Sequence, residues 1–173
     1  MIVGGADPGA DGAVALLDAE THRVLALVDM PMSGRELRVR ELALDLQAAL
    51  DGRRLGHLWI ERQAPYAGAQ RRIGASSAFN LGMRFASILA IAACSGWPVE
   101  IVGAAKWKRY FNITSDKALA LACAGRLLPE DVGRWTPRRG FCTRAQAIGR
   151  AEAALIALYG IRAFSTIAAG EAA

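Results

Sequence analysis

The stretch MIVGGADPGADGAVALLD, residues 1–18, opens the chain with two apolar runs that are separated by a short polar turn. The first run ends in Asp7, and Pro8 and Gly9 follow at once, which is a turn signal. The second run, Ala13–Leu17, has the length and composition of a strand. This pattern predicts two adjacent strands, with a carboxylate at the end of the first, where it can ligate a metal ion or meet a phosphate.

The rest of the chain alternates strand-like and helix-like segments, without repeats, low-complexity tracts or linkers. Ser76 or Ser77 is expected to cap one helix, and Gly160 to close the last. The order predicts one mixed α/β domain over residues 1–173. The expected further strands are Arg23–Val28, His57–Glu61 and Pro98–Val102, and the expected helices are Arg38–Leu50, Ser76–Cys94, Ala104–Phe111, Ser115–Leu128 and Thr143–Tyr159.

Composition narrows the class of protein. Hydrophobic residues make up 53% and charged residues 21% of the 173, which is typical of a globular chain. The net charge is +5, and 18 of the 21 basic residues are Arg, the side chain best suited to bidentate phosphate contacts. This balance favours an anionic partner.

Other features argue against membranes, secretion and cysteine-based sites. The most apolar region, residues 85–94, is too short to span a bilayer, and no secretory signal precedes the first strand. Cys94, Cys123 and Cys142 form no CxxC pair, so neither a zinc site nor a disulfide framework is indicated. We therefore expect a cytoplasmic protein with no membrane partner.

Three carboxylates stand out by their positions. Asp7 and Glu61 both end predicted strands, and Glu152 lies at the start of the apolar segment of the last helix. Each alone has an ordinary explanation, as a turn residue, an ion-pair partner or a surface residue. Together, in this order of elements, they favour an oxygen-rich site for Mg²⁺ or Mn²⁺.

Short motifs along nearly the whole chain resemble one known family. They are GADPG at 5–9, WIER at 59–62, SAFNLG at 77–82, KWK at 106–108, Asp116-Lys117 and GRAEAALIALYG at 149–160. In this order the chain resembles the RuvC-like Holliday junction resolvases, particularly the short phage and prophage versions, within the RNase H-like superfamily.

The resemblance implies an RNase H-like mixed five-stranded sheet flanked by helices. It also implies a homodimer with divalent-metal-dependent endonuclease activity on Holliday junctions or other branched DNA, in a bacterial or phage-infected cell. Asp7, Glu61 and Glu152 correspond to the family's catalytic and metal-binding acids. Paired metal ions in such a site activate a water molecule and stabilise the leaving oxygen.

One position departs from the family pattern. An Asp is usual just before the Gly-Arg-Ala-Glu run, where this chain has Ile148, one helical turn from Glu152. Either the chain is a weakened or inactive relative that binds branched DNA, or it is an engineered variant, or another acid substitutes. The candidate substitutes are Asp11, Asp116, Glu130 and Asp131. We expect Ile148 to weaken one metal position.

Basic and aromatic residues supply candidate DNA contacts, because Lys and Arg bind phosphates and exposed aromatic rings stack on unpaired bases. By resemblance, the loop after Glu61 lies near the branch point of the junction. Trp107 and Tyr110 are expected in the core, and helix Ser76–Cys94 in the core or a dimer interface. The candidate DNA-binding residues are Tyr66, Arg71, Arg72, Lys106, Lys108, Arg138 and Arg139.

A different enzyme class shares the opening pattern. Phosphotransferases of the actin and sugar-kinase type also carry Asp and Gly near phosphate after their first strand. Their architecture needs two lobes, and 173 residues are too few for two.

Overall fold

The computed structural model describes residues 1–62 and 74–171, with side chains up to residue 164. Five strands form the main sheet in the order β3-β2-β1-β6-β7, and a small hairpin, β4-β5, lies apart from it. The expected mixed five-stranded sheet is therefore confirmed. Its strands are β1 (Ile2–Ala6), β2 (Ala13–Asp18), β3 (Val24–Asp29), β6 (Leu55–Arg62) and β7 (Val99–Gly103), and the hairpin consists of β4 (Met32–Ser33) and β5 (Glu36–Leu37).

The central strand β1 sets the direction of the sheet. It pairs antiparallel with β2 and parallel with β6, and β6 pairs parallel with β7. All five residues of β1 are buried, because helices cover both faces of the sheet. Parallel pairing brings the carboxyl ends of β1, β6 and β7 to the same edge.

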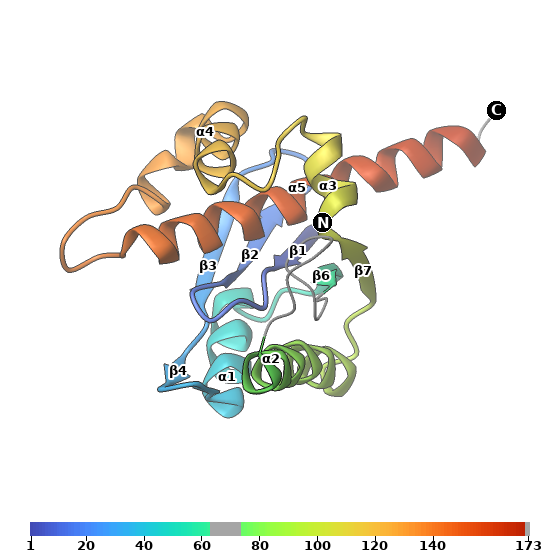
Figure 1. The fold of residues 1–173 in the computed structure, drawn as a ribbon. Coiled ribbons are helices and arrows are strands. Elements are labelled where there is room, and N and C mark those ends of the chain that lie inside the picture. The colour runs from blue at the N-terminus through green and yellow to red at the C-terminus, as the bar shows by residue number, and fades with distance from the viewer. Residues whose placement is uncertain (63–73, 172–173) are drawn as a thin grey trace.

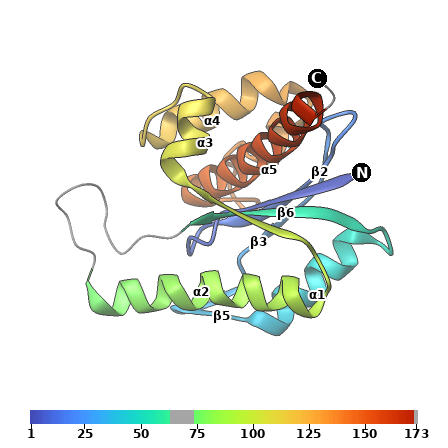
Figure 2. The same ribbon diagram turned by 90° about the vertical axis from the view of Figure 1, so that its right-hand side faces the viewer.

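Helices form a layer on each side of this sheet. Helices α1 (Val39–Leu50) and α2 (Ala75–Cys94) cover one face, as Figures 1 and 2 show. The opposite face carries α3 (Ala104–Tyr110), α4 (Lys117–Leu127) and α5 (Arg144–Glu171), with the 3₁₀ helix η1 (Pro129–Arg134) after α4. The core is accordingly split in two, with α5 at the centre of one half and α1 and α2 bounding the other.

The predicted end of the last helix is wrong. Helix α5 continues through Gly160 to Glu171 and extends beyond the sheet (Figure 1). A Cβ atom at Gly160 would lie 2.2 Å from the Trp59 ring, so this glycine makes room for an aromatic side chain within a continuing helix. Close packing, and not helix termination, explains the residue.

Two other local expectations also need correction. Helix α2 begins at Ala75 with Gly74 at its N-cap position, so neither Ser76 nor Ser77 caps it. Part of the predicted loop before the last helix is the 3₁₀ helix η1, which begins at Pro129. Helix α4 does have a side-chain cap: Asp116 accepts a hydrogen bond from the Ala118 amide at 2.9 Å.

Helix α2 buries only a narrow stripe. Phe79 and Met83, on its outer side, are 67% and 52% exposed. In the part of the chain that the structure describes, α2 is also the one helix whose length and mean hydropathy, 1.4, would allow it to cross a bilayer. Core helices of soluble proteins meet the same criterion. The long apolar helix therefore has an uncovered apolar face.

Candidate metal centre and nucleic-acid interface

Two of the acids lie side by side at the carboxyl edge of the sheet. Ala6 of β1 pairs in register with Ile60 of β6, so Asp7 and Glu61 follow at neighbouring positions. Asp7 also accepts a hydrogen bond from the Gly9 amide at 2.9 Å, and its own amide donates to Ala13. Asp7 thus stabilises the turn after β1, and it lies at the same edge of the sheet as Glu61.

Helix α5 brings the third acid to the same edge by lying directly on β1. A Cβ atom at Gly5 would lie 2.2 Å from the Ala157 backbone nitrogen. One at Gly149 would lie 2.0 Å from the Asp11 carbonyl oxygen. Only glycine permits these close approaches, and they set the height of α5 above the sheet. Glu152, between them on the helix, is 8% exposed.

Electrostatics show that the three carboxylates form one cluster. Burial, followed by the nearby charge of Glu152, raises the pKa of Asp7 from 3.8 to about 6. Burial, followed by the charge of Asp7, raises the pKa of Glu61 from 4.5 to about 7. The charge of Glu152 thus disfavours ionisation of Asp7, and the charges of Asp7 and Glu152 disfavour ionisation of Glu61. A bound cation would relieve that repulsion.

Helix α3 supplies two donors to this acid cluster, which we define as Asp7, Glu61 and Glu152. The helix begins directly after β7, the neighbour of β6, and therefore lies over the same edge. Trp107 donates from Nε1 to Glu61 Oε2 at 2.8 Å. Lys108 donates from Nζ to Glu152 Oε1 at 2.7 Å. Both carboxylates are thus oriented by side chains from one short helix.

The acid cluster suits a divalent ion by its chemistry, because carboxylate oxygens are the ligands that Mg²⁺ and Mn²⁺ prefer. Among the side chains of residues 1–62 and 74–164, however, no group of three His, Cys, Asp or Glu is arranged so that it could hold a metal ion. The contacts from Trp107 and Lys108 account for part of this arrangement, since they engage Glu61 and Glu152.

Arg84 is a residue of this site that the sequence reasoning missed. It lies on α2, is only 9% exposed and donates from Nε to the Pro8 carbonyl oxygen at 2.9 Å. Burial lowers the pKa of Arg84, and the nearby Asp7 charge opposes that effect. A signal was present: Arg84 shares the buried helix face with Ile88 and Ile91, four and seven residues on.

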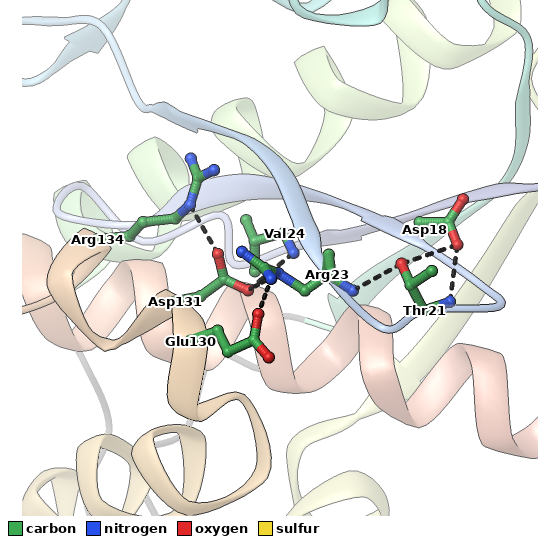
Figure 3. Close-up of polar contacts among 7 residues, drawn as sticks. All are labelled: Asp18, Thr21, Arg23, Val24, Glu130, Asp131 and Arg134. Carbon is green, nitrogen blue, oxygen red and sulfur yellow. Dashed lines mark hydrogen bonds and ion pairs between the residues drawn. The ribbon is translucent and has the colours of Figure 1, made fainter.

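Three of the possible substitutes for the missing acid are occupied elsewhere. Asp131, 3% exposed, accepts hydrogen bonds from the Val24 amide at 3.0 Å and from Arg134 Nε at 2.9 Å (Figure 3). Glu130 pairs with Arg23 in the same group (Figure 3), and Asp116 caps α4. Asp11 is exposed in the turn after β1.

Ile148 is itself 7% exposed and contributes an apolar side chain one turn before Glu152. In the structure Glu130 and Asp131 contact Arg23, Val24 and Arg134, and Asp116 caps α4, so none of the three replaces the missing acid through the contacts described.

The loop before α5 is held by stacked arginines. Arg138 and Arg150 each lie 4.7 Å from the Phe141 ring centroid. Arg150 also forms two hydrogen bonds of 2.7 Å to the Asp29 carboxylate of β3. This bidentate pair fastens the first turns of α5 to the sheet, two residues before Glu152. Arg139, next to Arg138, is exposed.

The predicted DNA-binding residues are distributed unevenly. Tyr66, Arg71 and Arg72 lie outside the described residues, and Lys106 is exposed on α3. Lys108 lies in the acid cluster, with its side chain 18% exposed. Trp107 is fully buried, as expected for a core residue. Tyr110 is 50% exposed, so its expected place in the core is wrong. Contacts of these residues with DNA stay predictions.

Comparison with known proteins identifies the fold. No protein-family model and no curated protein sequence matches the chain. Among solved structures, RuvC of Thermus thermophilus in complex with a Holliday junction substrate is similar, with a TM-score of 0.63 and 17% identity over 94% of this chain and 96% of that one. A second Thermus thermophilus RuvC structure has a TM-score of 0.57 and 21% identity, covering 95% of this chain and 97% of its own. The chain therefore has the RuvC-like, RNase H-type fold.

Proposed function

We propose that this protein is a metal-dependent, structure-selective endonuclease that cleaves Holliday junctions or other branched DNA as a homodimer. The observation that carries the proposal is the acid cluster: Asp7, Glu61 and Glu152 come from distant parts of the chain and interact at one sheet edge. The RuvC-like fold supports it, since the similar Thermus thermophilus protein is described with a Holliday junction substrate.

In this proposal the three acids would rearrange to hold Mg²⁺ or Mn²⁺, because the described residues are not arranged for a metal ion as they stand. When bound there, the ion would supply an activated water and charge stabilisation for the leaving oxygen of a phosphodiester. The chain's own residues prepare the site: Trp107 orients Glu61 through its 2.8 Å hydrogen bond. Arg84 holds the turn after Asp7 through the Pro8 carbonyl oxygen. Exposed Lys106, Arg138 and Arg139 supply positive charge for the DNA backbone.

The homodimer is supported by the apolar face of α2. A soluble protein that leaves Phe79 and Met83 mostly exposed on one helix has a candidate association surface there. A two-fold dimer would also match a four-way junction, since each active site could address one of two opposed strands. Sedimentation equilibrium tests this: Phe79→Glu should yield monomers, whereas Leu44→Glu, at another exposed apolar site, on α1, should not. Monomeric wild-type protein at micromolar concentration would exclude the dimer.

A second candidate function is branched-DNA binding without efficient cleavage. The apolar Ile148 favours it, because the turn of α5 before Glu152 then provides no further carboxylate. In this alternative the fold and the basic surface still bind branched DNA, but the acid cluster contributes little to cleavage.

The decisive experiment compares labelled four-way junction with linear duplex, in Mg²⁺ and in Mn²⁺, and scores retention and nicking separately. Nicking of the junction alone supports the endonuclease. Retention of the junction without nicking selects the second candidate. Equal affinity for both DNAs and no nicking would exclude both. Asp7→Asn serves as the control that should retain binding and lose cleavage.

A further inference from the structure

Lys108 places a positive charge inside the acid cluster. Its Nζ lies 2.7 Å from Glu152 Oε1, and the two side chains are only 18% and 11% exposed. By contrast, the surface pair Arg38–Glu41 is 56% and 44% exposed. Screening by water is therefore weaker for Lys108 and Glu152, and the ammonium neutralises this carboxylate in the folded protein.

The position of this ammonium is determined by its neighbours. Trp107, fully buried, anchors α3 and is hydrogen-bonded to Glu61. Lys108 Nζ also lies 5.0 Å from the Trp107 ring centroid, a cation–π distance. Its charge lowers the pKa of Asp7 and of Glu61, opposing the effect of burial on both. One ammonium thus acts on all three acids.

Charge and ligand type then separate the cluster into two ends. At one end, Asp7 and Glu61 follow register partners of β1 and β6, and the charge of Asp7 raises the pKa of Glu61. The charge of Glu152 also raises the pKa of Asp7, so Asp7 lies between the two ends. At the other end, Glu152 is paired with Lys108, and the helix turn before it carries Ile148, which has no oxygen. Lys117 also lowers the pKa of Asp7, and the charge of Arg84 interacts with Asp7. Positive side chains thus already offset much of the charge of the three carboxylates, which leaves little for a second divalent ion to neutralise.

We propose that the Lys108 ammonium replaces one of the two divalent ions, so that the site binds a single Mg²⁺ or Mn²⁺ through Asp7 and Glu61. The idea rests on the proposed function, but it concerns how many ions this chain can hold. Lys108 remains on Glu152, and its other N–H groups are available to a phosphate oxygen at the place where a second ion would stand.

Direct measurement of Mn²⁺ binding to the full chain tests this without any cleavage assay. Calorimetric titration of the wild-type protein should give one Mn²⁺ per protomer, and its electron paramagnetic resonance spectrum should lack the signature of a coupled Mn²⁺ pair. Two equivalents of Mn²⁺, or a coupled-pair spectrum, would overturn the proposal with the wild-type protein alone.

Variants sharpen the assignment. Lys108→Met keeps the apolar stem and removes the charge, so Mn²⁺ should bind about ten-fold more tightly. Adding Ile148→Asp to Lys108→Met should bring in a second ion and its coupled spectrum. Lys106→Met, on the same helix but exposed, is the matched control and should bind as the wild type does. Unchanged Mn²⁺ affinity in a folded Lys108→Met protein would also overturn the proposal.

The junction-nicking assay, run in parallel, separates this inference from the function. If the protein binds one Mn²⁺ and does not nick the junction, the single-ion inference is supported and the proposed nuclease function is wrong. If the protein nicks the junction with two Mn²⁺ ions bound, the nuclease function is supported and the single-ion inference is wrong.

Discussion

Two groups of acidic side chains in this protein lie in opposite electrostatic settings. Asp131 is buried among donors: the Val24 amide, Arg134 and, at 3.6 Å, Arg23 (Figure 3). Asp7 is buried near Glu61 and Glu152, and its pKa is raised to about 6. The Asp131 group ties β3 to η1 and stabilises the fold. The acid cluster gathers like charges at a cost in stability, which is typical of functional sites.

Substitution of Asp7 should have the largest effect on activity, without a loss of folding stability. Asp7→Asn keeps the size and the turn, but it removes a charged metal ligand. We expect junction nicking to fall by about a thousand-fold, in line with the loss of several kcal/mol of charge stabilisation. Single-turnover cleavage and urea unfolding of the same preparations measure both quantities. A comparable loss of folding stability would show that Asp7 is structural.

Substitution of Asp131 should have the opposite profile. Asp131→Ala leaves the buried Val24 amide and the facing arginines without their acceptor. The free energy of unfolding should fall by about 3 kcal/mol, with metal affinity and cleavage retained wherever the protein is folded. Urea titration gives the first quantity and Mn²⁺ calorimetry the second. If Asp131→Ala were as stable as the wild type, the Asp131 group would not have the stabilising role that distinguishes it from the acid cluster.

The pH dependence of stability should reveal the acid cluster in metal-free protein. Both Asp7 and Glu61 have a raised pKa, so the folded state binds protons more tightly than the unfolded chain does. Their contribution is present below the ordinary values of 3.8 and 4.5 and is lost as pH rises through about 6 and about 7.

We expect a decrease of several kcal/mol over this range in EDTA, and its reversal at neutral pH by Mn²⁺. Thermal unfolding in steps of pH measures it. The double variant Asp7→Asn, Glu61→Gln should show neither the decrease nor the response to Mn²⁺, and a wild-type profile in that variant would refute the assignment.

The smallest effect is expected at Glu130. It belongs to the Asp131 group, but Glu130 and Arg23 have 66% and 51% of their side chains exposed. Glu130→Ala should therefore change the free energy of unfolding by less than about 0.5 kcal/mol. Urea titration beside Asp131→Ala gives the comparison. If Glu130→Ala lost as much free energy of unfolding as Asp131→Ala, the difference in exposure between Glu130 and Asp131 would not explain their contributions to stability.

Sequence reasoning was most successful where a local pattern has a local cause. The apolar runs and turn signals placed the strands of the sheet, and Asp7 and Glu61 followed from their positions at strand ends. It failed at Gly160, because helix termination and close packing both select glycine. It also failed for the α2 caps, since nearby serines do not reveal which residue begins the helix.

Sequence reasoning could not predict contacts between residues that are far apart in the chain. Arg84 and Pro8, or Lys108 and Glu152, are far apart in the chain, and only the sheet order brings them together. The contacts of Asp131 were also not predictable, because its sequence position suggests a loop residue. In the structure it is buried and accepts a hydrogen bond from the Val24 amide of β3.

The amino-acid sequence alone determined the strand order in the chain, the helical segments and the identity of the acids, because side-chain periodicity and turn chemistry act over a few residues. The tertiary structure alone decided what each acid faces, because burial and charge proximity depend on which elements pack together. For this reason Glu152 could be named from its motif, whereas its ammonium partner, Lys108, became visible only when α3 lay over the carboxyl edge of the sheet.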